Sequence, residues 1–442
     1  MQKIIINHLG PVQKFEMDIK DFNLLIGEQT TGKSTIAKCI YFFRMIKTTV
    51  TDYLCQICDT ALYNGKEIDS GFNTVLKSEL KSIFISLFGF SWDLDERLYL
   101  KYEFAHNIWI DLILNKNHNK TFISVRYSNE LKSKINELEL QAKQLYMQKK
   151  DISTSLAYAS KERIRNYDNM KISVNEIFND DKETYYIPAG RSMITLLVNN
   201  RSLLENENLD LITRQFMQII ESIHASFSDG IRNVHKRFPD SERKFDTSIL
   251  SEKLVSNLKG DYRYSPGKEY IIIEDGLNTN DKIPINFASS GQQELLWLLN
   301  QLYILILKKE KSFVIIEEPE AHLYPTLQKD VMDFISFFVN INNSSVLITT
   351  HSPYILTVSN AYYCAGKLLK ENDSIAKQVY GIIGNKRSID PDQLSAYKLS
   401  KNNKISNLVD ENLQELATDL IDDVSDKINR MYIDLLYLQE NN

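Results

Sequence analysis

The sequence has little glycine, little cysteine and little proline. Its 442 residues include 15 glycines, nine prolines and four cysteines, which puts glycine at about half of its usual share of roughly 7%. This composition excludes collagen-like and low-complexity chains, and so few cysteines exclude a disulfide-built scaffold and fit a reducing compartment. A place where glycines cluster therefore requires a specific explanation.

The sequence also lacks an apolar run long enough to cross a bilayer, which takes about 20 residues. The stretch at 83–88 is short, and Asn300 and Gln301 interrupt the longer stretch that begins at Glu294. The N-terminal apolar run, Ile4 to Ile6, is too short for a secretory signal. We therefore expect a cytoplasmic protein without a membrane partner.

The net charge of the chain excludes few classes of binding partner. The formal net charge of −6 at pH 7 gives the chain no general attraction to phosphate backbones or anionic lipid. Any contact with DNA requires a local basic patch. DNA therefore stays an open partner.

The pattern of apolar residues predicts an α/β fold. Residues 1–45 show two strands, a third strand at 22–27, a polar loop and a helix, and residues 270–286 have the pattern of a β-hairpin. The short apolar runs at 313–317 and 346–350 are typical of strands buried on both faces of a parallel sheet. Strands that alternate with helices indicate an α/β core. An acidic amphipathic helix is expected over 413–438.

Residues 128–183 are polar and almost free of glycine and proline. Their apolar positions recur in steps of three, four and seven, at Leu131, Ile135, Leu138, Ala142, Leu145, Ile152 and Leu156. This spacing fits the seam of a short coiled coil. It fits equally a surface helix that packs on its own domain, and both interpretations stay open.

Two of the scarce glycines frame a phosphate-binding loop between a predicted strand and a predicted helix. The pattern G-x-x-x-x-G-K-S-T comprises Gly27, Glu28, Gln29, Thr30, Thr31, Gly32, Lys33, Ser34 and Thr35. Such a loop wraps a polyphosphate with its N–H groups, and the following helix N-terminus adds positive potential. Lys33 is expected to reach the β- and γ-phosphates, and the Ser34 hydroxyl to ligate Mg²⁺.

A pair of carboxylates follows the strand at 313–317. Glu317 and Glu318 stand at its carboxyl end, where ligands collect in open α/β sheets. We expect Glu317 to hold Mg²⁺ and Glu318 to orient and deprotonate the attacking water.

With these residues the chain resembles ABC-type P-loop ATPases of the SMC/RecF/OLD-like group. Residues 27–35 resemble Walker A, 288–299 the signature motif, 313–325 Walker B with the following D-loop, and 348–356 the switch strand with its histidine. The resemblance implies an α/β head with a mixed sheet and a helical or short coiled-coil insertion. We expect the first part of the head at 1–127, the insertion at 128–260, the second part at 261–365 and an α/β extension with a helix at 366–442.

The resemblance also implies roles for further residues. The signature residues Ser289, Ser290, Gly291 and Gln292 are expected to face ATP bound by a second copy of the chain, so that two heads sandwich ATP. His351 is expected to contact the γ-phosphate and the attacking water. Arg191, in the segment Pro188–Ser192, is a candidate cation near the phosphates, with a buried salt bridge as the alternative. ATP and Mg²⁺ are the implied cofactors.

Four functions were compared on these motifs. A nuclease of the OLD type needs a further acidic domain for which few residues remain after His351, and a transporter subunit is expected to carry LSGGQ and an Asp-Glu pair that this chain lacks. We therefore expect an ATP-dependent switch that assembles with itself and controls a separately encoded effector, with a nuclease as the candidate. Such ATPases occur in antiviral systems such as Septu, PARIS and some retrons. The alternative is a DNA-repair or chromosome-maintenance ATPase of the RecF or RecN type.

Overall fold

The computed structural model describes residues 2–58, 72–89, 96–117, 120–150, 156–197, 209–238, 244–273, 281–401, 404–410, 415–416 and 430–433. Every statement below on structure concerns these residues.

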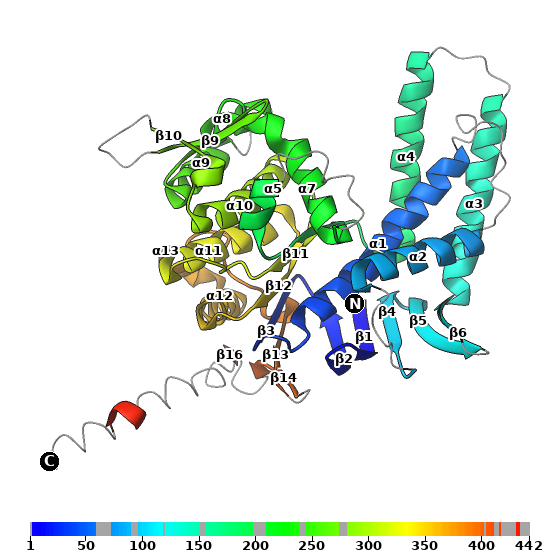
Figure 1. The fold of residues 1–442 in the computed structure, drawn as a ribbon, viewed down its shortest axis with the longest axis horizontal. Coiled ribbons are helices and arrows are strands. Elements are labelled where there is room, and N and C mark those ends of the chain that lie inside the picture. Colours follow the sequence, from blue (N-terminus) through cyan, green and yellow to red (C-terminus); the bar gives the residue numbers. More distant parts are fainter. Residues whose placement is uncertain are drawn as a thin grey trace.

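A six-stranded sheet forms the centre of the fold, and the predicted α/β class is confirmed. Its order is β14 (Ile405–Asn407), β13 (Leu394–Leu399), β3 (Phe22–Gly27), β12 (Ser345–Thr350), β11 (Ser312–Glu317) and β7 (Glu183–Ile187). The strands from β13 to β7 are parallel, and β14 is antiparallel to β13. The carboxyl ends of β3, β11 and β12 therefore meet at one edge of the sheet (Figure 1).

An antiparallel sheet stands beside the central one. It comprises β2 (Val12–Ile19), β1 (Gln2–Leu9), β4 (Tyr99–Ala105), β5 (Ile108–Asn117) and β6 (Lys120–Tyr127), in that order. The N-terminal strand pair expected from the sequence is its β1–β2 hairpin.

The remaining strands of the described residues form two smaller sheets. One consists of β8 (Gly260–Ser265), β9 (Lys268–Ile273) and β10 (Lys282–Pro284). The antiparallel pair β9–β10 is the hairpin predicted at 270–286, and its turn lies outside the described residues. The other joins β15 (Val409–Asp410) to β16 (Glu415–Leu416). The acidic helix expected at 413–438 therefore does not begin at its predicted start, and most of it lies outside the described residues.

Helices cover both faces of the central sheet (Figure 1). On the side of the antiparallel sheet lie α1 (Lys33–Cys58), α2 (Phe72–Phe88), α3 (Asn129–Lys150) and α4 (Leu156–Phe178). The other helices are α5 (Arg191–Leu197), α7 (Leu211–His224), α8 (Ile231–Val234), α9 (Lys244–Leu258), α10 (Ser290–Lys308), α11 (Pro325–Asn342), α12 (Pro353–Glu371) and α13 (Ala376–Ile383). No helix in the described part of the chain combines the length and apolarity needed to cross a membrane.

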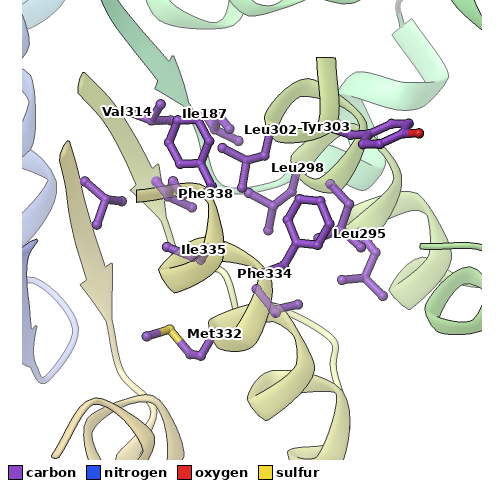
Figure 2. Packing of buried hydrophobic residues seen from close by; sticks show 14 of the residues in the cluster. Ile187, Leu295, Leu298, Leu302, Tyr303, Val314, Met332, Phe334, Ile335 and Phe338 are labelled. Carbon is purple, nitrogen blue, oxygen red and sulfur yellow. The ribbon is translucent and has the colours of Figure 1, made fainter. Parts of the chain in front are cut away.

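Alternating residues of the central strands divide the interior into two cores. In β11, Phe313 and Ile315 belong to the core shared with α1 and the antiparallel sheet. Val314 and Ile316 belong to the opposite core, which is built largely from α10 and α11 (Figure 2). Every residue of β11 is buried, which explains why its sequence reads as a continuous apolar run.

The predicted helical insertion packs on α1 over the part nearest the body. Leu131, Ile135, Leu138 and Ala142 of α3 are buried in the same core as α1, and Leu145 packs against it. For this part of the chain the structure supports the surface-helix interpretation. Ile152 lies outside the described residues, and the side chain of Leu156 is likewise not described.

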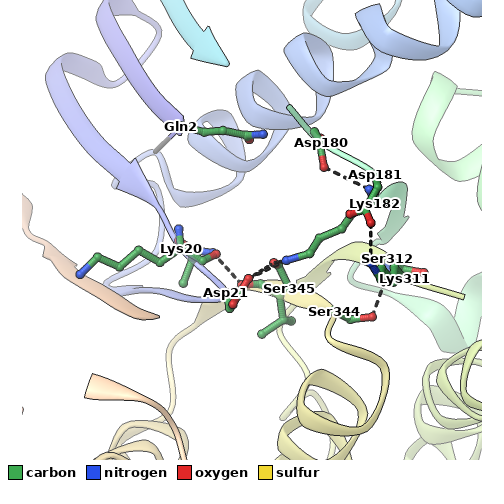
Figure 3. Close-up of polar contacts among 12 residues, drawn as sticks. Gln2, Lys20, Asp21, Asp180, Asp181, Lys182, Lys311, Ser312, Ser344 and Ser345 are labelled. Carbon is green, nitrogen blue, oxygen red and sulfur yellow. Dashed lines mark hydrogen bonds and ion pairs between the residues drawn. The ribbon is translucent and has the colours of Figure 1, made fainter. Parts of the chain in front are cut away.

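A polar network joins the opposite, amino-terminal ends of the parallel strands (Figure 3). Lys182 Nζ donates to Asp21 Oδ1 at 2.6 Å and to Ser345 Oγ at 2.5 Å, so the residue before β7 is tied to β12 and to the residue before β3. These bonds fix the strand starts relative to one another.

A buried ion pair anchors α1 to the segment between α4 and β7. Arg44 Nη2 donates to Asp180 Oδ2 at 2.7 Å, and the two side chains are only 2% and 8% exposed. Burial alone would raise the pKa of Asp180, but the charges of Arg44 and Lys47 outweigh it and hold that pKa below its usual value. The pair therefore holds the helix that follows the phosphate loop against the sheet.

We predict that Asp180→Ala lowers the free energy of unfolding by about 3–5 kcal/mol, because it leaves the Arg44 guanidinium buried without its carboxylate. Asp181→Ala is the matched control. Asp181 pairs with Lys311 where both side chains are about half exposed, and such a pair contributes about 0–1 kcal/mol. Chemical denaturation measures both variants, and equal losses would contradict this account.

Candidate active site

Close packing on both sides explains the two glycines of the phosphate loop between β3 and α1. A Cβ at Gly27 would lie 2.0 Å from the carbonyl oxygen of Leu399 in β13, and one at Gly32 would lie 2.5 Å from the Val12 Cγ2 atom. Gly32 also has φ of +99°, a conformation that side chains with a Cβ rarely adopt. The loop is thus held between the β1–β2 hairpin and β13.

Lys33 lies inside this loop. Its Nζ donates to the carbonyl oxygens of Gly27 and Glu28 at 2.9 and 2.7 Å. Burial lowers the pKa of Lys33 to about 8, while the nearby carboxylates of Glu318, Glu320 and Glu317 act in the opposite direction. A bound polyphosphate would supply the charged partner that the ammonium group lacks in the loop.

The rest of the loop presents backbone donors and hydroxyls. Because α1 begins at Lys33, the N–H groups of Lys33, Ser34 and Thr35 have no partner within the helix and face the loop end. Ser34 is exposed at this end of α1. Thr31 Oγ1 donates to the Glu28 carbonyl at 2.9 Å and Thr30 Oγ1 to that of Gln29 at 2.6 Å, so these two hydroxyls brace the loop itself.

The two carboxylates predicted for the site, Glu317 and Glu318, stand at the end of β11, which is separated from β3 by β12. Glu317 is 7% exposed. Glu318 leaves the strand with φ of +43°, which is unfavourable for a residue with a side chain. Its N–H donates to the Thr349 carbonyl of β12 at 2.8 Å, and this bond helps to hold the turn.

His351 lies between Lys33 and Glu318. Its Nδ1 is 3.4 Å from Lys33 Nζ, and its Nε2 is 3.3 Å from Glu318 Oε1. The structure thus brings together three groups that the sequence placed far apart, from the loop after β3 and the ends of β11 and β12. An ammonium, an imidazole and a carboxylate so arranged can bind a phosphate and handle the proton of an attacking water.

Arg191 is turned into the protein. Its side chain is completely buried, and its guanidinium donates to the carbonyl oxygens of Pro188, Glu317 and Glu318 at 3.0, 2.8 and 2.9 Å. Arg191 Nε lies 3.2 Å from the Glu294 carboxylate. Burial lowers the pKa of Arg191 and Glu294 opposes this shift. This geometry supports the salt-bridge alternative over a contact with phosphates.

The signature residues form an exposed helix N-terminus. Ser289 caps α10, its Oγ accepts the Gln292 N–H, and the Gln292 side chain accepts the Ser289 N–H. Ser289 and Ser290 are exposed. A Cβ at Gly291 would lie 3.2 Å from the His322 carbonyl oxygen. None of the hydrogen bonds recorded for these four residues reaches the phosphate loop.

The donor set fits the implied Mg²⁺. Glu317 Oε1 is buried and has no hydrogen-bond partner among the described residues, which leaves it available as a ligand. Mg²⁺ prefers oxygen ligands and is often bound by one or two protein groups together with phosphates and waters. Ser34 and Glu317 would supply the protein ligands.

One residue of the site was missed by sequence reasoning. Glu320 Oε1 accepts hydrogen bonds from Thr350 Oγ1 and from the His351 N–H, both at 2.7 Å. The sequence does show Glu320 as a further acid close to Glu317 and Glu318. Its hydrogen-bond partners, however, stand at the end of β12 and could not be inferred from the neighbouring residues.

Comparison with known proteins decides the family. The AAA ATPase domain family matches residues 1–356. The chain belongs to the AAA ATPase domain family. It is therefore an ATPase that binds ATP.

Other similarities are more limited. The chain is 32% identical over 87 residues to protein ea59 of Escherichia phage lambda, a match that spans 20% of this chain and 16% of that protein. The solved SMC head domain from Thermotoga maritima aligns with a TM-score of 0.33 and 10% identity over 80% of this chain and 90% of that one. The recombination mediator protein RecF of the RecFOR pathway aligns with a TM-score of 0.32 and 11% identity over 92% and 97%. The family assignment rests on the domain match.

We predict that Lys33→Ala abolishes ATP binding, because the loop loses the ammonium group that opposes the phosphate charge. Lys38→Ala, in the same helix and partly exposed, is the control and should bind normally. Titration with a fluorescent ATP analogue measures both. Binding by Lys33→Ala at wild-type affinity would show that the nucleotide lies elsewhere.

Proposed function

We propose that the protein is an ATP-driven switch that hydrolyses ATP with Glu318 and His351. The observation that carries the proposal is that His351 contacts both Lys33 and Glu318. Its Nδ1 lies 3.4 Å from Lys33 Nζ, and its Nε2 lies 3.3 Å from Glu318 Oε1. Glu318 orients and deprotonates the water, His351 holds the γ-phosphate and the water, and Lys33 neutralises the phosphates. Mg²⁺, held by Ser34 and Glu317, adds charge stabilisation when bound.

We further propose that two copies assemble through ATP. Ser289 and Ser290 at the N-terminus of α10 are exposed, and among the described residues none of the hydrogen bonds of the four signature residues reaches the phosphate loop of the same chain, so a phosphate from a second copy can reach them. Three exposed aromatic side chains stand close in sequence to the signature, the turn after β11 and the switch histidine, namely Phe287, Tyr324 and Tyr354, with exposures of 81%, 73% and 51%. Exposed aromatic residues of this kind are enriched in protein interfaces.

Glu318→Gln is expected to trap an ATP-bound assembly, because it removes the base but keeps the size of the side chain. Mass photometry with ATP and Mg²⁺ measures the assembly, and turnover should be lost. Glu371→Gln, an exposed carboxylate on α12, is the control. A variant that stays monomeric with ATP would contradict assembly, whereas unchanged turnover would contradict the role of Glu318.

Mixing two inactive variants tests whether the signature acts on the partner's ATP. Ser290→Glu places a negative charge where we expect the γ-phosphate, yet an acid suits the first turn of a helix and should not unfold α10. Alone, it should lack turnover. Mixed with Lys33→Ala, part of the turnover should return, since one site of the mixed dimer keeps both intact halves. No recovery would favour a site completed within one chain.

We propose that the switch controls a separately encoded effector in antiviral defence. Two basic residues of α3, Lys134 and Lys143, pair with Glu130 and Glu139 of the same helix, and charges neutralised in this way do not favour DNA. Expression of the native operon should reduce phage plaques, and Lys33→Ala should remove this protection. Turnover that rises on addition of DNA, without protection from phage, would instead support the repair alternative.

A further inference from the structure

Glu320 ties the turn after β11 to the end of β12. One oxygen of its carboxylate, Oε1, accepts the Thr350 hydroxyl and the His351 N–H at 2.7 Å each. Both donors stand at the point where β12 ends. The carboxylate therefore fixes the backbone of the residue that carries the imidazole.

The second oxygen is not needed for this task. Glu320 Oε2 is buried and has no hydrogen-bond partner among the described residues. A glutamine has the same shape, and its single carbonyl oxygen can accept both bonds. The geometry thus separates two possible contributions of Glu320, the placement of the acceptor and the negative charge.

The histidine depends on this placement. Its ring contacts, 3.4 Å to Lys33 Nζ and 3.3 Å to Glu318 Oε1, are at the long end of the hydrogen-bond range. Thr350 Oγ1 also accepts the Ser352 N–H at 2.9 Å, so the backbone on both sides of His351 is held through one pair of side chains. Release of that pair would let the ring leave Glu318.

We propose that Glu320 is a positioning residue for ATP hydrolysis, which holds the backbone of Thr350 and His351 so that the imidazole stays between Lys33 and Glu318. This proposal rests on the proposed hydrolysis by Glu318 and His351. It assigns the effect of Glu320 to the position of its acceptor oxygen and not to its charge.

Turnover and ATP affinity of Glu320→Ala and Glu320→Gln test the proposal. Glu320→Ala should lower kcat by about 10²-fold, the cost of a small misplacement of a catalytic group, with little change in ATP affinity. Glu320→Gln should stay within a few-fold of the wild type. Equal losses in the two variants would overturn the proposal, because the charge would then be what matters.

A double variant separates positioning from a general structural role. On a His351→Ala background, Glu320→Ala should cost nothing further, since the group that it positions is gone. Loss by the same factor on both backgrounds would overturn the proposal. If Glu320→Ala does not fold, Thr350→Val removes, at nearly constant shape, the hydroxyl that donates to Glu320 and accepts the Ser352 N–H, and it leaves the bond from the His351 N–H to Glu320 in place. It should lower kcat, again only while His351 is present.

Hydrogen exchange gives a readout that does not need turnover. Exchange of the His351 amide should speed up in Glu320→Ala and stay slow in Glu320→Gln. Unchanged exchange in Glu320→Ala would overturn the proposal whatever the turnover. A wild-type protein without ATP turnover, but with the expected exchange pattern, would refute the proposed hydrolysis and leave the positioning contact standing.

Discussion

The buried guanidinium of Arg191 is the constraint on which the site depends. It donates to the carbonyl oxygen of the residue after β7 and to two carbonyl oxygens at the end of β11, and it lies against Glu294 of α10. A charge buried without partners costs several kcal/mol, so these three elements can shift only together. The carbonyl groups that Arg191 holds include that of Glu318, the residue that leaves β11 in a left-handed conformation. The cation thus helps to maintain a strained backbone at Glu318, the carboxylate that we propose as the catalytic base.

The turn after β11 extends this constraint in two directions. On one side, the His322 carbonyl lies against Gly291 at the start of α10. On the other, Glu320 is bonded to Thr350 and His351. One short turn therefore contacts both the surface where we expect a second copy and His351, the residue that we propose to hold the γ-phosphate. These contacts form a continuous chain of packed groups through which assembly and hydrolysis can be coupled.

Local patterns predicted much of the site, and long-range contacts explain the rest. The phosphate loop at 27–35 and the buried strand with its acids at 313–318 could be predicted, because each motif consists of consecutive residues. The buried position of Arg191 could not be predicted in this way, because its partners Glu294 and Glu317 are more than 100 residues away in the sequence. The face of α3 was ambiguous for a similar reason: Leu131 and Ile135 have the same spacing whether they contact α1 or another helix. The contribution of β13 to the central sheet was not predicted either, because its parallel partner β3 lies far away in the sequence, with Leu394 paired to Phe22.

The pairing of the central sheet has a consequence for how the protein is made. β3, which leads into the phosphate loop, has β12 and β13 as its neighbours, and Phe22 pairs with Val346 and Leu394. A ribosome that adds 5–20 residues per second therefore exposes this apolar strand without either neighbour for roughly 20 to 70 s. During that interval the nascent chain carries an unpaired strand and an incomplete loop. The phosphate loop can be completed only after β12 and β13 have been synthesised, and until then the unpaired apolar strand is prone to aggregation.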